Sequence, residues 1–150
     1  MSQSLSRVLV HMVFGTKHLS PDLRPEVREA LHPYFVTVLD DIGCVSLRVG
    51  GVEDHAHMLF GLSRTATIAQ VAETVKTSSS KWIKTKGWGL DQFAWQGGYG
   101  AFSVSESAAN TVVRYIRDQE QRHRKMTFQE EYRELLKRHG IPFDERYLWD

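Results

Sequence analysis

Apolar and polar residues alternate along the 150-residue chain in a way that predicts short strands interleaved with amphipathic helices. An unbroken apolar run from Ser6 to Lys17, rich in β-branched and aromatic residues, predicts a central strand that is covered on both faces. Apolar residues then recur at helical spacing from about Pro21 to Leu39, after a Ser-Pro-Asp sequence typical of a helix start. Pro33 lies inside this segment, so we expect a kink or a break there.

The middle of the chain predicts a hairpin and a second helix. Residues 44–49 alternate as in a half-buried strand, and Gly50-Gly51 is expected to turn the chain back into a strand over Val52–Gly61. A helix is expected to begin near Thr67 and to end near Lys86. The segment Trp88–Tyr99 is aromatic and glycine-rich, and we interpret it as an irregular loop.

The C-terminal third predicts one more strand and two helices. The strand covers residues 100–105, the first helix about 108–125, and a capping box at Thr127–Glu130 opens the last helix, which continues to Arg138. The aromatic tail at 147–149 is expected to dock on an apolar surface, such as that of a partner chain. The order β-α-β-β-α-β, then two helices, predicts an α+β fold: a ferredoxin-like split βαβ sandwich with an antiparallel sheet and helices on one face.

Composition is ordinary for a soluble protein of one domain, which we expect to span residues 1–150. Cys44 is the only cysteine, which excludes a disulfide framework and a cysteine-rich zinc site and fits a reducing compartment. No signal-peptide pattern or membrane-length apolar run is present, so a cytoplasmic location is expected. The net charge of +1 gives no support to nucleic-acid binding by itself.

Charge is nevertheless unevenly distributed. Residues 76–86 contain four lysines and no acid, and 111–125 is a second basic stretch. Such stretches can bind phosphates, although solvated helix faces are the commoner explanation. The lysines of the first stretch are Lys76, Lys81, Lys84 and Lys86.

A pair of histidines is the first candidate site. His55 and His57 lie two positions apart on the predicted strand 52–61, so their side chains point to the same face. Neutral imidazole is the commonest metal ligand, and two neighbouring imidazoles can bind a divalent ion. His-x-His also occurs on strands by chance. We expect His11, which lies in the central strand, to be a packing residue.

A polar stripe on the predicted helix 108–125 is the second candidate. Tyr115, Gln119 and His123 are four residues apart and therefore share one helical face. A tyrosine hydroxyl has a pKa of about 10 and is a weak nucleophile, but a metal ion can activate a phosphodiester toward it. The amide oxygen of Gln119 is a candidate third ligand beside His55 and His57. The ordinary alternatives are a packed tyrosine and a solvated amide.

These motifs resemble those of a known family. His55-Ala56-His57 resembles the His-hydrophobic-His signature of HUH nucleases, and Tyr115-Ile116-x-x-Gln119 resembles the catalytic-helix motif of the single-tyrosine HUH transposases of small bacterial insertion sequences, the IS200-like family. Further blocks that resemble the family lie at 13–17, 96–104, 127–132 and 140–149, so the resemblance covers nearly the whole chain. The position before His123, often a second histidine in this family, is Arg122, and we leave His123 out of the ligand set.

The resemblance implies a DNA transposase that cleaves and rejoins single-stranded DNA at element-end hairpins. Tyr115 on the C-terminal catalytic helix would form a 5′-phosphotyrosine, while His55, His57 and Gln119 would hold Mg²⁺ or Mn²⁺, without a nucleotide cofactor. The partners implied are single-stranded DNA and a second copy in a homodimer, with active sites completed in cis or in trans. The four lysines become candidates for DNA binding, and the loop aromatics become candidates for base stacking: Trp88, Phe93 and Trp95. Packing in the core or at a dimer interface is the commoner role for each of these aromatics.

Three alternatives stay open. One is a domesticated relative that acts on host repetitive hairpins, and the C-terminal blocks favour the mobile-element form over it. The second is a non-catalytic module that binds single-stranded nucleic acid, and the joint presence of His55, His57, Tyr115 and Gln119 argues against it. The third is a metal-dependent hydrolase of small phosphate esters in which Tyr115 only packs.

Overall fold

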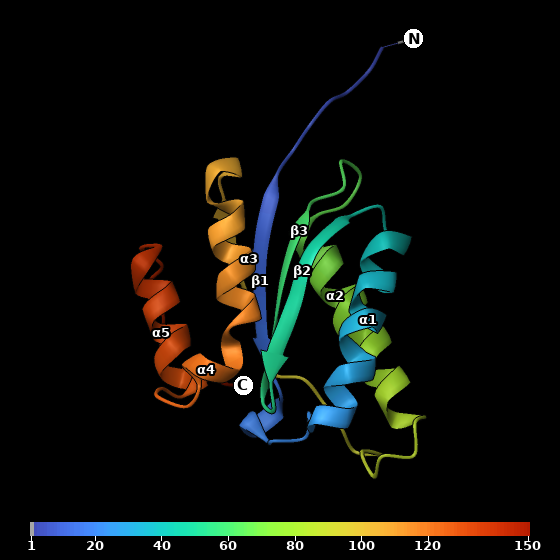
Figure 1. Cartoon of the computed structure of the whole chain (residues 1–150), viewed down its shortest axis with the longest axis vertical. Coiled ribbons are helices and arrows are strands. Elements are labelled where there is room, and N and C mark those ends of the chain that lie inside the picture. The colour runs from blue at the N-terminus through green and yellow to red at the C-terminus, as the bar shows by residue number, and fades with distance from the viewer. Residues whose placement is uncertain (1) are drawn as a thin grey trace.

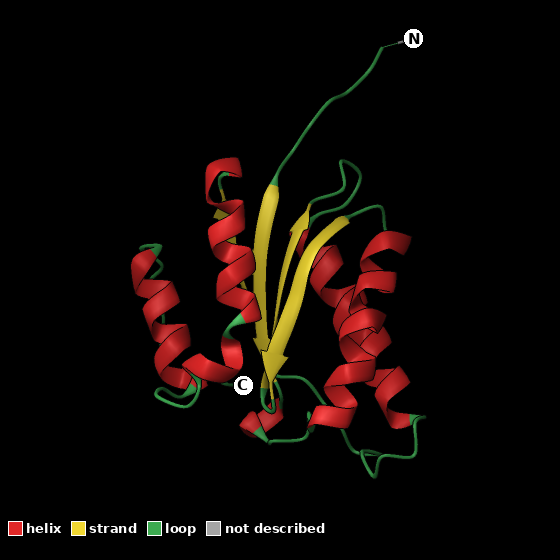
Figure 2. Cartoon of the chain, viewed as in Figure 1, coloured by secondary structure: helices red, strands yellow, loops and turns green. Residues whose placement is uncertain are grey.

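A four-stranded antiparallel sheet lies between two layers of helices in the computed structural model of the chain (Figures 1 and 2). The structure describes residues 2–150; Met1, the first residue of the predicted domain, lies outside the described residues. The elements in chain order are β1 (Leu9–Gly15), η1 (Lys17–Leu19), α1 (Pro25–Asp41), β2 (Val45–Val52), β3 (His55–Gly61), α2 (Ile68–Lys84), β4 (Gly100–Val104), η2 (Glu106–Ala108), α3 (Ala109–Arg117), α4 (Gln119–Arg122) and α5 (Phe128–Arg138).

The sheet has the order β2-β3-β1-β4, and every neighbouring pair is antiparallel. In the centre, Met12 of β1 lies opposite Met58 of β3 on one side and Ala101 of β4 on the other. The first strand of the chain is therefore a central strand, and the predicted α+β fold with an antiparallel sheet is confirmed.

Helices cover both faces of this sheet, which explains why β1 has no polar alternation. Helices α1 and α2 pack on the face that carries Met12, Phe14 and Met58, and Figure 1 shows them on the right. The C-terminal helices α3 and α5 lie on the left, over the opposite face, where they pack on residues such as Leu59 and Val13. Side chains alternate along a strand, so His55 and His57 point into this second layer.

The predicted turn at Gly50-Gly51 is wrong. Both glycines lie within β2, where Gly50 pairs with His57, and the chain reverses at Glu53-Asp54 instead. Packing explains why glycine occupies position 50, because a Cβ atom there would lie 2.8 Å from the Cγ2 atom of Ile116 on α3. The glycine allows the end of α3 to lie directly on the edge strand.

The first helix also differs from its prediction. It begins at Pro25, not near Pro21, because the backbone of Leu23 instead donates to the Glu53 carbonyl of the β-hairpin. It then continues past Pro33 to Asp41, so the predicted break is absent. Buried residues on both sides of the proline hold the helix against the sheet, and packing of this kind offsets one missing hydrogen bond. Over residues 2–150, no helix combines the length and apolar character needed to cross a bilayer.

The predicted helix 108–125 is divided. The backbone of Asp118 (φ −94°, ψ 21°) leaves the helical region and separates α3 from the short α4. The capping box at Thr127 is confirmed, with its side chain accepting from the Glu130 backbone. The aromatic tail docks on its own chain, since the Trp149 ring lies 5.7 Å from that of Tyr132 on α5.

Candidate active site

Strand β3 carries its two histidines into the space between the sheet and the C-terminal helices. The side chains of His55 and His57 are fully buried, and the His55 ring stacks on Phe128 of α5 at a centroid distance of 4.1 Å. A buried imidazole needs hydrogen-bond partners for its nitrogens. The partners of these two rings indicate how each ring is protonated.

In both imidazoles Nδ1 points outward and Nε2 points toward a common centre. The Nδ1 atom of His55 lies 2.7 Å from a carboxylate oxygen of Asp54, which only accepts, so this nitrogen carries the proton. The Nδ1 atom of His57 lies 2.8 Å from Nε2 of His11, a pair that shares one proton. His11, expected only to pack, therefore orients a ligand candidate, as the outer partners of metal-binding histidines do.

A carboxylate that the sequence did not reveal occupies the centre. One oxygen of Glu131, on α5, lies 3.2 Å from Nε2 of His55 and 3.3 Å from Nε2 of His57. The Glu131 side chain is 1% exposed. Its position offered a signal, because it shares the apolar face of α5 with Tyr132 and Leu135, where an acid is unusual.

Gln119 and His123 reach the same centre despite the break at Asp118. The Gln119 amide oxygen lies 2.9 Å from Nε2 of His55, and the amide nitrogen donates to Glu131 over 2.9 Å. Nε2 of His123 lies 3.0 Å from both the Gln119 oxygen and a Glu131 oxygen. His123, excluded from the predicted ligand set, is thus part of the cluster that His55 and Gln119 form.

The Tyr115 hydroxyl contacts the other carboxylate oxygen of Glu131. This hydroxyl donates to Glu131, and the tyrosine ring meets that of His57 edge-on at a centroid distance of 5.7 Å. The guanidinium of Arg122 lies over the tyrosine ring, 4.3 Å from its centroid. The Arg122 Nε atom is buried without a hydrogen-bond partner, and it lies 4.0 Å from Glu131.

The surroundings shift the pKa of His55, Glu131 and Tyr115. Burial alone would lower the pKa of His55, but hydrogen bonds to Asp54 and Glu131 raise it to about 9. Burial alone would raise the pKa of Glu131, but the charges and hydrogen bonds of the surrounding histidines hold it well below its usual value. Burial and then the Glu131 charge raise the pKa of Tyr115, while Arg122 acts in the opposite direction.

The donor set fits a divalent cation. His55, His57 and Glu131 each offer one ligand atom, and these atoms lie within 4.8 Å of one another. Because the Nδ1 proton is directed at Asp54, release of the second proton from Nε2 would leave a lone pair of His55 facing the Gln119 and Glu131 oxygens. Acceptor atoms gathered in this way need a cation or a proton between them. Glu131 therefore joins the predicted ligands His55, His57 and Gln119 as a candidate.

The predicted DNA-binding lysines lie elsewhere, in and just after α2 on the opposite face of the sheet. The ammonium of Lys76 donates to the carbonyl groups of Gly97 and Gly98, so it ties α2 to the following loop. Lys81 and Lys84 are exposed, as is Lys86, whose ammonium lies over the Trp82 ring.

Two of the three loop aromatics pack in the core, which is the commoner of the two roles considered for them, and are not available for base stacking. Phe93 and Trp95 are 3% and 8% exposed and belong to the core between the sheet and α2. The Trp95 indole also donates to the buried Ser79 hydroxyl at 2.9 Å. Trp88 is partly buried and lies edge-on to Trp82, at a centroid distance of 5.5 Å.

Comparisons with known proteins agree with the fold and identify related proteins. A family model described as "Transposase IS200 like" matches residues 4–119. A crystal structure from Deinococcus radiodurans R1, described only provisionally as a transposase, has 21% sequence identity and a TM-score of 0.59, and the match covers 79% of this chain and 98% of that one. A REP-associated tyrosine transposase bound to a REP hairpin has 14% identity and a TM-score of 0.59, covering 82% and 74%. No curated protein matches the chain.

Proposed function

Because the chain belongs to the family of IS200-like transposases, we propose that it cleaves and rejoins single-stranded DNA with Tyr115 as the nucleophile. One observation carries the proposal: the Tyr115 hydroxyl and the His55–His57 pair contact opposite oxygens of one buried carboxylate, Glu131. A nucleophile and a metal-binding group are thereby held at adjacent positions within one chain. A tyrosine that only packs against its neighbours does not require a hydrogen bond to the carboxylate that also contacts the two histidines.

In the first step, the Tyr115 oxygen attacks the scissile phosphorus and forms a 5′-phosphotyrosine. The bond from phosphorus to the 3′-oxygen breaks, and that oxygen leaves as a 3′-hydroxyl after taking up a proton. The Glu131 oxygen that accepts the hydroxyl hydrogen bond orients the Tyr115 oxygen for attack, and the tyrosine proton is released to solvent. In the second step, a 3′-hydroxyl from another DNA end attacks the phosphotyrosine, and Tyr115 leaves with its proton restored. One phosphodiester replaces another, so no nucleotide cofactor is needed.

Four residues would hold the divalent ion: His55, His57, Gln119 and Glu131. Bound there, Mg²⁺ or Mn²⁺ would polarise the non-bridging phosphate oxygens and neutralise charge that develops during attack. Oxygen ligands suit Mg²⁺, whereas the imidazoles shift the preference toward Mn²⁺. His11 and Asp54 keep the ligand rings oriented, because each bonds an outer ring nitrogen.

Arg122 has a separate role in the proposed reaction. Its guanidinium lies over the Tyr115 ring and opposes the rise in the tyrosine pKa that burial and Glu131 cause. A cation at this place stabilises the developing phenolate and the leaving phenolate of the second step. Its buried Nε–H, which has no partner among residues 2–150, is free to donate to a phosphate oxygen.

We further propose hairpin-bearing single-stranded DNA as the substrate and a homodimer as the active form. Exposed Lys81, Lys84 and Lys86 would contact the hairpin backbone, while Lys76 is held by its two carbonyl partners. A second candidate function is a domesticated relative that acts on host repetitive hairpins. The likeness to a REP-associated transposase bound to a REP hairpin favours it, and repeated hairpins that flank the gene would distinguish it.

A covalent-adduct assay tests the proposal. The downstream fragment becomes attached through its 5′ end, so the DNA hairpin must carry its label at the 3′ end. Incubation with Mn²⁺ followed by denaturation is expected to give a labelled protein band that Tyr115→Phe abolishes. Tyr147→Phe, which alters an exposed tyrosine, should keep the band. His57→Ala should lose both bound Mn²⁺ and the adduct. Cleavage that persists in Tyr115→Phe would refute the tyrosine nucleophile.

A further inference from the structure

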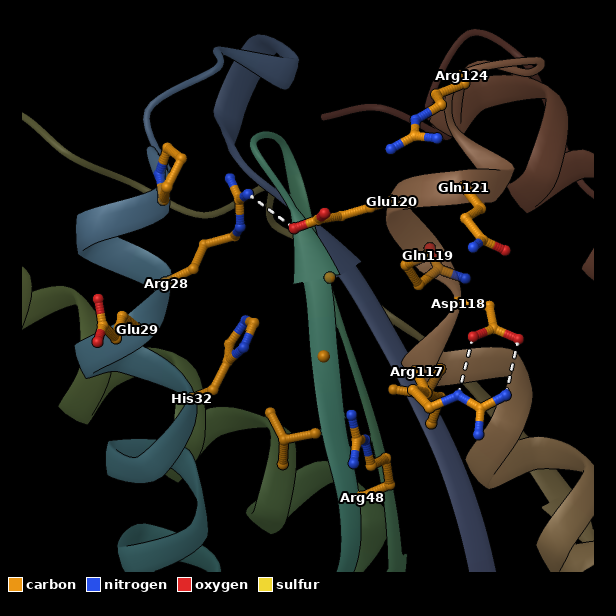
Figure 3. Close-up of a pocket in the computed structure, with 15 residues that line it drawn as sticks. Arg28, Glu29, His32, Arg48, Arg117, Asp118, Gln119, Glu120, Gln121 and Arg124 are labelled. Atoms are coloured by element: carbon orange, nitrogen blue, oxygen red, sulfur yellow. Dashed lines mark hydrogen bonds and ion pairs between the residues drawn. The ribbon is translucent and has the colours of Figure 1, made fainter.

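A second site lies beside the proposed active site, at the open edge of the sheet. A cleft of about 450 Å³ separates α1 from α3 and α4, and the edge strand β2 forms its floor between Arg48 and Gly51 (Figure 3). Gln119 lines this cleft, although its amide oxygen lies 2.9 Å from Nε2 of His55. The cleft therefore ends at a residue of the catalytic cluster.

Arginine dominates the charge of this cleft. Four arginines line it: Arg28, Arg48, Arg117 and Arg124. Two are paired with acids, Arg117 with Asp118 at 2.9 Å and Arg28 with Glu120 at 3.4 Å, as the dashed lines in Figure 3 show. The third acid, Glu29, points away from the cleft in the same view.

Two of the arginines lack a counter-charge. Across residues 2–150, neither Arg48 nor Arg124 has a carboxylate within 4.0 Å. Arg48 extends from β2 and Arg124 lies beyond α4, so they stand on different elements along the cleft (Figure 3). Two guanidinium groups spaced along a groove suit a ligand that carries more than one negative group.

A histidine in the wall supplies an independent sign of a polar ligand. Nε2 of His32 on α1 is buried and has no hydrogen-bond partner among the described residues. An unpaired buried polar atom costs free energy, so a hydrogen-bonding group that enters the cleft would stabilise it. Burial, then Arg28 and Arg48, lower the pKa of His32 to about 4, so the ring is neutral at pH 7 and can donate or accept a hydrogen bond.

We propose that this cleft binds the phosphodiester backbone of the single-stranded DNA that continues from the scissile phosphate. The inference rests on the proposed function, since it assumes that DNA reaches the cluster at Gln119. Among the described residues that line the cleft, His32 is the only one with an aromatic ring, so base stacking contributes little. Binding is therefore expected to be independent of base sequence and strongly dependent on salt.

The test compares two DNA ligands on Tyr115→Phe protein, which binds without reacting. One is a hairpin with a single-stranded extension past the cleavage position, and the other is the same hairpin without the extension. Arg48→Ala and Arg124→Ala are each expected to weaken binding of the extended hairpin roughly fivefold to tenfold. Each should also reduce the slope of log K against log salt by about 0.7. Binding of the bare hairpin should stay unchanged.

Matched variants control for charge and folding. Arg64→Ala removes an exposed arginine that does not line the cleft. It should leave intact the extension preference, which is the ratio of the affinities for the extended hairpin and the bare hairpin. Arg48→Lys keeps the charge and should recover part of the affinity. Glu120→Gln releases Arg28 from its acidic partner and should strengthen binding of the extended hairpin, a gain that misfolding does not produce.

An extension preference that survives the combined Arg48→Ala and Arg124→Ala changes would overturn the cleft assignment, even if the wild-type chain forms its tyrosine adduct. A preference lost equally in Arg64→Ala would also overturn it, because general charge would then explain the binding. If the wild-type chain neither binds single-stranded DNA nor forms the adduct, the proposed function fails and the cleft assignment fails with it. The adduct assay therefore separates the two failures.

Discussion

Single side chains decide what the buried cluster can do, and Glu131 is the most informative of them. It contacts two histidines through one oxygen and the Tyr115 hydroxyl through the other. Burial raises the pKa of Tyr115 and the negative charge of Glu131 raises it further, so without a bound cation the hydroxyl is poorly activated for the proposed attack. A cation that shares the carboxylate would relieve this effect. In the proposed reaction, metal binding and activation of Tyr115 would therefore be coupled through one residue.

Glu131→Gln tests this coupling at the residue scale. The amide keeps the shape of the side chain but removes the anionic ligand, so we expect Mn²⁺ affinity to fall at least about tenfold. Titration calorimetry with Mn²⁺ measures the change. Glu134→Gln, on an exposed position of the same helix, is the control and should bind Mn²⁺ like the wild type. Unchanged Mn²⁺ affinity in Glu131→Gln would remove this residue from the ligand set.

The sequence predicted part of this site and missed the rest for a physical reason. Spacing placed His55 and His57 on one strand face, and Tyr115 and Gln119 on one helical face, and the structure brings both pairs together. Glu131 was missed because an acid on an amphipathic helix is normally solvated; its place on the apolar face of α5 was a signal, and the tertiary fold shows that its side chain is buried against the histidines.

At the scale of elements, the contact between β2 and α3 sets the position of Tyr115, the proposed nucleophile. Gly50 of β2 allows Ile116, near the end of α3, to lie directly on the strand. Tyr115 precedes Ile116 in sequence, and Gln119 follows it by three residues. The sequence suggested a turn at Gly50-Gly51 because paired glycines usually mark turns. The glycines instead serve a close approach between elements, which no local pattern reveals.

Gly50→Ala should therefore disturb both stability and the site. A Cβ atom would lie 2.8 Å from a side-chain atom of Ile116 and 2.9 Å from its backbone carbonyl oxygen. Relieving that overlap is expected to cost about 1–3 kcal/mol, which lowers the melting temperature by roughly 5 °C. Gly98→Ala is the control, since its Cβ would meet nothing within 4 Å. A Gly50→Ala protein that melts like the wild type would contradict the importance of this contact.

Other differences between expected and observed elements have the same origin. Packing against the sheet keeps α1 helical on both sides of Pro33. The backbone at Asp118 divides the helix that the sequence predicted over 108–125. Local sequence predicted the number and type of the main elements well. Their ends depended on contacts between segments far apart in the chain, such as Leu23 with Glu53.

At the scale of the whole molecule, β3, the α3–α4 segment and α5 of one chain meet at the site. The family resemblance left open whether the tyrosine helix completes its own histidine pair or that of a partner. Within this chain the Tyr115 hydroxyl already contacts the carboxylate that His55 and His57 share. The arrangement favours sites completed in cis, whether or not the chain forms a dimer.

Mixing two inactive variants tests this assignment. Tyr115→Phe lacks the proposed nucleophile, and His57→Ala lacks a proposed metal ligand. If each site is built from one chain, the mixture should form no more adduct than either variant alone, measured with the 3′-labelled hairpin after subunits have exchanged. Recovery of adduct in the mixture would show instead that the helix of one chain serves the histidines of another.

The central claim is that Tyr115 becomes covalently joined to DNA. Its most direct measurement is mass spectrometry of protease-digested protein after reaction with hairpin-bearing single-stranded DNA and Mn²⁺, followed by nuclease trimming. We predict one peptide that carries a residual 5′-nucleotide on Tyr115, and its disappearance when Mn²⁺ is withheld. A nucleotide found on another residue, or DNA cleaved with no modified peptide, would contradict the claim.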